Sequence, residues 1–167
     1  MVGSEWRQYR NERWGFCAGV PKGWQVDEGI NGAGGRFFLP GSKAGSSVAV
    51  GALPNDCLDE HDPYGMHCDR QKTVQEIESE EVDALKTYWK ATEIKTISSK
   101  AEQFQGLPAL RTRLSYVENG KPVVNQMLRF IRAGNMYAIE FQCSPSDVKP
   151  CEATSRHIEE SFRFRCR

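Results

Sequence analysis

The 167-residue sequence lacks a long apolar run, an excess of charge of one sign, and a recognisable catalytic motif. No stretch approaches the roughly 20 apolar residues of a membrane-spanning helix, and no signal-peptide core stands at the start. Lysine plus arginine and aspartate plus glutamate each number 22, so the formal net charge is zero. This balance excludes the basic footprint that is typical of nucleic-acid-binding domains.

The motifs of nucleophilic and phosphate-binding enzymes are also absent. Gly-x-Ser-x-Gly does not occur, and the Gly-Ser-Lys-Ala-Gly run at 41–45 falls in a predicted loop between two strands. The glycine-rich run at 32–35 lacks the strand-then-helix context that phosphate binding requires. We therefore expect no catalytic residue and no cofactor, and predict that the protein is not an enzyme.

The sequence contains six cysteines, an even number. They form two close pairs and one pair near the chain ends, namely Cys57 with Cys68, Cys143 with Cys151, and Cys17 with Cys166. Such an arrangement is typical of a disulfide framework, which persists in oxidising compartments. Free cytosolic thiols and a metal site are the alternatives, although zinc sites use Cys-x2-4-Cys knuckles and not these x10 and x7 spacings.

The disulfide interpretation predicts an exported protein, either periplasmic or extracellular. Because no signal peptide is present, we interpret the sequence as a mature or trimmed chain from which a signal peptide or lipid anchor has been removed. Residues 1–4 are interpreted as a cloning remnant. The remaining residues, 5–167, are expected to form a single domain, which at this length buries a core without depending on the disulfides.

Apolar runs bounded by glycine and proline turns predict strands in the first third of the chain, at 6–9, 14–20, 24–27, 36–39 and 47–53. A helix is predicted at 73–90, where Val74, Ile77, Val82, Leu85 and Trp89 form one apolar stripe. Its acidic first half and its lysines near the end complement the helix dipole.

A second helix is predicted at 150–164, with a proline in its first turn. The helical phase points Cys151 inward, toward Cys143 at the end of the preceding strand. A local disulfide between the two is therefore geometrically plausible.

Residues 93–143 are predicted to form an antiparallel meander, and two glycine turns set its register. A two-residue turn at Gly134-Asn135 is expected to pair Ala133 with Met136. In the strands that follow from this turn, the expected partners are Phe130 with Ile139, Leu128 with Phe141, and Arg129 with Glu140 on the opposite face.

The earlier turn, at Asn119-Gly120, allows two registers. A plain two-residue loop places Leu114 opposite Asn125 and mismatches the faces, whereas one bulge residue places it opposite Gln126. With the bulge, Thr112 pairs with Leu128, Leu110 pairs with Phe130, and Arg111 lies beside Arg129. This arginine pair is a candidate partner or anion contact; the alternative is a salt-bridged sheet face.

The loop between Cys57 and Cys68 is rich in histidine and carboxylate side chains. A polar loop held by a disulfide is suited to contacting a partner, and the residues predicted to do so are Asp59, His61, Asp62, Tyr64 and His67. The alternative is a divalent-cation site, since histidine and carboxylate groups are metal ligands. Its ligands would be His61, Asp62, His67 and Asp69.

The order of several short motifs resembles that of the PsbP/Mog1-like superfamily. The run WGFCAGVPKGW from Trp14 to Trp24 is similar to the Gly-Phe-x-x-x-x-Pro-x-x-Trp opening of that family. An aromatic strand at 36–39, the central helix and the run at 106–110 follow in the family's order. So do the runs at 136–141 and 158–163.

The resemblance implies an α+β fold in which helices flank an antiparallel sheet, an α/β/α sandwich that disulfides would staple in this chain. It also implies a protein without catalysis: PsbP-type proteins assist photosystem II, Mog1 binds a small GTPase in the nucleus, and many bacterial members are exported. The cysteine framework departs from these members and argues against a nuclear role. Only Pro21, Trp24 and Phe162 match the family's framework, and no functional residue is carried over.

We therefore expect an exported bacterial module of this fold that contacts a protein partner as a binding or scaffold component. The alternatives are a periplasmic metal- or small-ligand-binding protein that uses the 57–68 loop, and a hydrolase or an inhibitor of an extracellular enzyme.

Overall fold

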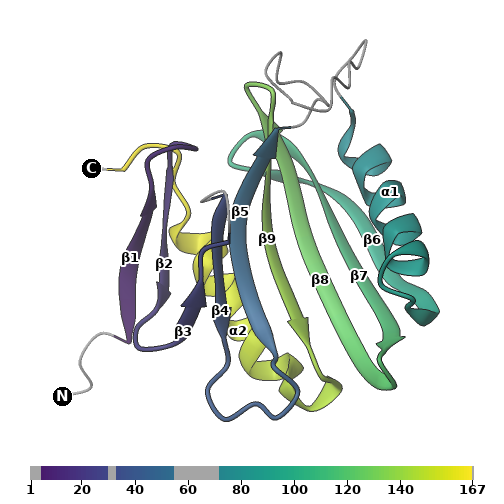
Figure 1. The fold of residues 1–167 in the computed structure, drawn as a ribbon. Helices are drawn as coiled ribbons and strands as arrows, with labels where there is room; N and C mark the ends of the chain where they lie inside the picture. Colours follow the sequence, from purple (N-terminus) through teal and green to yellow (C-terminus); the bar gives the residue numbers. More distant parts are fainter. Residues whose placement is uncertain (1–4, 30–32, 55–71, 167) are drawn as a thin grey trace.

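The computed structural model describes residues 5–29, 33–54 and 72–166. Among these residues, a seven-stranded antiparallel sheet has the order β3-β4-β5-β9-β8-β7-β6, and a separate hairpin pairs β1 with β2 (Figure 1). The strands are β1 (Trp6–Asn11), β2 (Phe16–Pro21), β3 (Gln25–Asp27), β4 (Gly34–Phe38), β5 (Ser47–Pro54), β6 (Thr92–Phe104), β7 (Leu107–Glu118), β8 (Lys121–Arg132) and β9 (Asn135–Cys143). The helices are α1 (Val74–Thr87) and α2 (Val148–Ser161), the second preceded by a 3-10 turn, η1 (Pro145–Asp147).

The main core lies between one face of the sheet and α2, and we call this the α2 face. Alternate residues of β5, β8 and β9 point into it because side chains alternate along a strand. The five phenylalanines with no exposed surface all lie there: Phe16, Phe37, Phe130, Phe141 and Phe162. The structure confirms the predicted C-terminal helix, which begins two residues earlier than expected.

The β1–β2 hairpin is attached to the end of α2 by backbone, side-chain and covalent links. Cys17 N donates to Arg163 O at 2.9 Å, and Arg163 N donates to Cys17 O at 2.8 Å. Ser161 Oγ accepts from Gly19 N at 2.8 Å. A disulfide joins Cys17 to Cys166, and a second one joins Cys143 to Cys151. Both predicted pairings are confirmed; Cys57 and Cys68 lie outside the described residues.

The opposite face of the sheet carries α1, and we call it the α1 face. The helix begins after Thr73, whose hydroxyl accepts from Glu76 N, as expected for an N-cap. Leu85 packs there with Leu114 and Tyr116 in a second, smaller cluster. The predicted stripe is wrong at Trp89, which is 61% exposed because the helix ends at Thr87.

The hairpin between β8 and β9 turns one residue earlier than predicted. Arg132 pairs with Asn135, so Ala133 and Gly134 form the turn, with φ of 49° and 78°. A type I′ turn requires positive φ at both central positions, and this turn has glycine at the second. The predicted pairs Phe130 with Ile139, Leu128 with Phe141 and Arg129 with Glu140 are therefore wrong. Leu128 opposes Ile139, Phe130 opposes Tyr137, and Arg129 opposes Ala138. The error is two residues, so each side chain keeps its predicted face.

The predicted bulge between β7 and β8 is also wrong. Glu118 pairs with Lys121 and Leu114 pairs with Asn125, so Asn119-Gly120 is a plain two-residue turn. This slip of one residue exchanges the faces. The bulge was predicted because it places the apolar residues of both strands on a single face of the sheet. In the structure α1 covers a second face, and Leu114 packs there. Arg111 consequently lies on the α2 face, and Arg129 on the α1 face.

Candidate functional site

The predicted partner-contacting residues of the 57–68 loop lie outside the described residues, as do the alternative cation ligands, and both stay predictions. These residues are Cys57, Asp59, His61, Asp62, Tyr64, His67, Cys68 and Asp69. In the part of the chain that is described, no group of three or more His, Cys, Asp or Glu side chains is placed to hold a metal ion. No described helix is long and apolar enough to span a bilayer.

Arg111 is engaged between the sheet and α2. Its Nη1 and Nη2 donate to the two carboxylate oxygens of Glu159 at 2.8 and 3.0 Å, and Nη2 also donates to Glu102 at 2.8 Å. The hydrogen bonds to Glu159 are the largest cause that raises the pKa of Arg111, and those to Glu102 add to it. Glu102 and Glu159 both belong to this chain. Through Glu159, Arg111 links β7 to α2.

Arg129 is 2% exposed and forms an ion pair with Glu81 of α1. Burial lowers the pKa of its guanidinium to about 10, because removal from water disfavours the charged form. Its Nε has no hydrogen-bond partner among the described residues. The predicted contact between Arg111 and Arg129 is wrong, since the sheet separates them.

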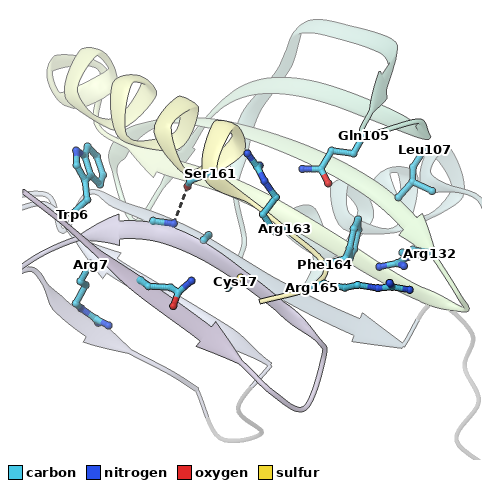
Figure 2. Close-up of a pocket in the computed structure, with 13 residues that line it drawn as sticks. Trp6, Arg7, Cys17, Gln105, Leu107, Arg132, Ser161, Arg163, Phe164 and Arg165 are labelled. Atoms are coloured by element: carbon cyan, nitrogen blue, oxygen red, sulfur yellow. Dashed lines mark hydrogen bonds between the residues drawn. The ribbon is translucent and has the colours of Figure 1, made fainter. Parts of the chain in front are cut away.

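The structure instead gathers four other arginines around one groove, which we call the arginine groove (Figure 2). Its volume is about 910 Å³, within the range of ligand-binding clefts. Two walls come from the β1–β2 hairpin and the segment after α2, and the others come from the β6–β7 turn and the end of β8. The four arginines are Arg7, Arg132, Arg163 and Arg165.

Backbone carbonyls and an aromatic ring position two of these guanidinium groups. Arg132 lies over the ring of Phe164, with Cζ 4.2 Å from the ring centroid. Arg163 Nη1 donates to the carbonyl oxygens of Glu160 at 2.9 Å and Phe162 at 2.6 Å. In Figure 2, Arg132 and Arg165 lie beside Phe164, and Arg163 projects from the end of α2.

No carboxylate side chain belongs to the described lining of the arginine groove. None of its four arginines forms an ion pair within 4.0 Å in the described part of the chain. A chain with zero net charge therefore concentrates uncompensated positive charge at one concave site. Such a site attracts anions, because like charges gathered in a cleft focus the field.

The walls of the groove are held in place by links between distant segments. The Cys17–Cys166 disulfide lies at the wall that contains Cys17. Gln105 Nε2 donates to Phe162 O at 2.7 Å, which joins the β6–β7 turn to the end of α2. A groove with fixed walls loses less entropy when a ligand binds.

None of the four arginines was predicted as a site residue. Arg7 and Arg132 are separated from the C-terminal arginines in sequence, and only the fold brings them together. One local signal was present: arginine alternates with other residues in the final run RFRCR, which begins at Arg163. An alternating run places arginines on one side of an extended segment.

No protein-family model matches the sequence, and no curated protein matches it. Three similar solved structures show its fold class, and all of them are distant in sequence. The first is cyanobacterial PsbP (CyanoP) from Synechocystis sp. PCC 6803, at 11% identity and TM-score 0.64, covering 97% of this chain and 94% of that one.

The second is LpqN, "involved in cell envelope biogenesis of Mycobacterium tuberculosis", at 13% identity and TM-score 0.55, covering 94% of this chain and 88% of that one. The third is PA94 from Pseudomonas aeruginosa, described as a putative regulator, at 14% identity and TM-score 0.53, covering 91% and 92%. The chain thus has a PsbP/Mog1-like fold, as the motif order predicted. At these identities the likeness concerns the fold alone.

Proposed function

We propose that this chain is an exported, non-catalytic binding module whose arginine groove holds an acidic segment of a protein partner. The observation that carries the proposal is the groove itself: four arginines and no carboxylate line a cavity of about 910 Å³. Arginine is suited to this role because its planar guanidinium can bind a carboxylate through two parallel hydrogen bonds.

The two described disulfides support the exported part of the proposal. Structural disulfides persist in oxidising compartments and are rare in the cytosol. One of them joins residues 149 positions apart and so links the two ends of the described chain. Among the similar structures, LpqN is described as acting in cell envelope biogenesis, which agrees with a compartment of this kind.

The chemistry of the lining supports a binding role over a catalytic one. Ser161 Oγ accepts from Gly19 N and lies 2.8 Å from the carbonyl of His157, so backbone groups engage this hydroxyl. Cys17 is held in a disulfide and is not a thiolate nucleophile. The remaining polar side-chain groups of the described lining are guanidinium groups, amide groups and the indole N–H of Trp6, and these do not take part in proton transfer at neutral pH.

The test measures the affinity of a fluorescein-labelled hexaglutamate peptide by fluorescence anisotropy. We expect Arg132→Gln/Arg163→Gln to weaken binding at least about tenfold, since charge-assisted hydrogen bonds contribute roughly 1.5–3 kcal/mol each. Raising the salt concentration should weaken binding to the unmodified protein, because ions screen exposed charges.

The matched control is Lys121→Gln/Arg156→Gln, which removes two positive charges outside the arginine groove. We expect it to change the affinity less than about twofold. Circular dichroism of both variants checks that the fold is retained. Equal weakening by the two double variants, or equal binding of hexalysine, would show that the groove is not an acidic-segment site.

A further inference from the structure

A second groove lies on the opposite face of the sheet, beside α1, and we call it the α1-face groove. Its volume is about 580 Å³. Because α1 lies over β7 and β8, the groove occupies the side of this face formed by β4, β5 and β9. It shares no lining residue with the arginine groove.

The floor of the α1-face groove consists of two rows that cross the sheet. One row runs from Gly34 through Gly51 and Ala138 to Arg129. The close packing of the strands requires glycine at position 34, because a Cβ on Gly34 would lie 2.1 Å from Val50 O. Small side chains leave the centre of the floor open and apolar.

The second row leads from Arg36 to Met127 through Ala49 and Glu140. Ala49 and Ala138 are both half-buried; Ala138 pairs with Gly51, and Ala49 lies two residues before Gly51 on β5. Methionine and isoleucine side chains add to the apolar lining: Met127, Met136 and Ile77. An apolar body of a ligand fits this part of the groove.

The charged lining of the groove is acidic in sum. It contains Arg36 and Arg129, against five carboxylates: Asp27, Glu28, Glu80, Glu81 and Glu140. Three of the carboxylates are engaged in ion pairs, Glu140 with Arg36, Glu81 with Arg129, and Glu80 with Lys72. Asp27 and Glu28 have no ion pair within 4.0 Å in the described residues. They are the groups that a ligand cation would neutralise.

The other end of the groove contains a buried donor without an acceptor. Arg129 is 2% exposed, and its Nε has no hydrogen-bond partner in the described part of the chain. A buried donor that stays unpaired costs roughly 1–3 kcal/mol, so such groups call for a bound partner. An oxygen acceptor on a ligand would meet this need.

We propose that the α1-face groove binds a small organic cation that has an apolar body and an oxygen acceptor at its opposite end. The cation would face Asp27 and Glu28, the apolar body would lie on Ala49 and Ala138, and the acceptor would face Arg129. Four strand spacings, about 19 Å, separate β3, which carries Asp27, from β8, which carries Arg129, and this span sets the length of the ligand together with its two polar contacts. This site is different from the arginine groove, so the proposal is independent of the acidic-segment proposal and is tested separately.

The test uses three probes of one chain length. Methyl 12-aminododecanoate has an ammonium group at one end and an ester at the other, monomethyl dodecanedioate replaces the ammonium by a carboxylate, and dodecylammonium lacks the ester. Calorimetry measures the affinities, and the ¹⁵N–¹H signal of Arg129 Nε reports hydrogen bonding at that atom. We expect the first probe to bind at least about tenfold tighter than the second and to shift the Arg129 signal more than dodecylammonium does.

Two double variants with the same change of charge locate the cation. Asp27→Asn/Glu28→Gln should weaken methyl 12-aminododecanoate about tenfold, since each carboxylate lost removes a charged acceptor. Glu93→Gln/Glu118→Gln, at acids outside the groove, should change the affinity less than about twofold. Ala138→Leu should abolish binding because the larger side chain occupies the floor.

The proposal is overturned if the carboxylate probe binds as tightly as the ammonium probe, or if the two charge variants bind alike. An Arg129 signal that stays unmoved by the ester probe also overturns it. Asp27 is the last residue of the exposed strand β3, and Glu28 follows it. Substituting these two residues therefore leaves both hydrophobic cores intact, and a loss of binding can be assigned to the lost charges.

Discussion

Asp147 links two parts of the molecule through one carboxylate oxygen. Its Oδ2 accepts from Ser46 Oγ at 2.6 Å, Ser42 Oγ at 2.7 Å and Ser144 Oγ at 3.0 Å. Ser42 and Ser46 belong to the β4–β5 loop, whereas Ser144 precedes η1. Hydrogen bonding to the ionised form, from Ser46 first and then Ser42, lowers the pKa of Asp147.

Asp147 should therefore make stability depend on pH in acid. Because its folded pKa lies below the unfolded value of about 3.9, the ionised carboxylate stabilises the fold above that pH, and this contribution is lost as pH falls through the folded pKa. Asp147→Asn should lower the urea midpoint at pH 7, and the difference from the unmodified protein should shrink below about pH 4. Asp83→Asn, on the exposed side of α1, is the control. A difference that is independent of pH would contradict the assignment.

At the scale of elements, α2 is anchored to the sheet by a disulfide and two ion pairs. Its first turn carries Cys151, bonded to Cys143 at the end of β9. Two arginines of β7 reach its carboxylates, Arg111 to Glu159 and Arg113 to Glu152, both at 2.8 Å. After the helix ends, Cys166 is bonded to Cys17 of β2. The helix thus joins the hairpin and the sheet.

The two disulfides should differ in their contributions to stability. In the chain-entropy model, closing a span of 149 residues contributes roughly 5 kcal/mol, and closing one of 8 residues contributes roughly 2–3 kcal/mol. Cys17→Ala/Cys166→Ala should therefore lower the free energy of unfolding more than Cys143→Ala/Cys151→Ala does. Urea unfolding measures both, and the first variant should also show the larger m-value because its unfolded chain is more expanded. The reverse order of stabilities would show that local packing around Cys151 outweighs chain entropy.

At the scale of the whole molecule, the sheet has two buried faces of unequal strength. The α2 face holds the large aromatic cluster around Phe16, Phe130 and Phe162. The α1 face holds a smaller cluster around Leu85 and Tyr116, and its other half forms the α1-face groove. A helix held by fewer buried contacts opens at a lower free energy.

We therefore expect the amides of α1 to exchange with solvent at least about tenfold faster than those of α2, a difference of about 1.4 kcal/mol in opening free energy. The helices have the same length, 14 residues, which makes the comparison direct. Hydrogen exchange followed by NMR or mass spectrometry measures it, and Leu85→Ala should accelerate α1 selectively. Equal protection of the two helices would show that the clusters are equally stabilising.

Much of the fold could be predicted because its signals are local. The strands of the first third, both helices and the pairing of Cys143 with Cys151 agree with patterns that a few neighbouring residues define. The β8–β9 register failed because the turn begins at Ala133, a residue that carries no turn signal of its own. The β7–β8 register failed because its pattern depends on both faces of the sheet at once. Leu114 opposes Asn125 because α1 buries a second face, and the alternation along β7 cannot show which face a distant helix will cover.

The sequence by itself determined the order of the elements, the position of the turn at Asn119-Gly120 and the pairing of Cys143 with Cys151, since backbone preference and local covalent chemistry act over short spans. The tertiary structure alone decided that Arg111 and Arg129 lie on opposite faces and that the arginine groove exists. Its arginines come from β1, the end of β8 and the segment after α2. Long-range packing brings such segments together, and no local pattern encodes the charge that results from their proximity.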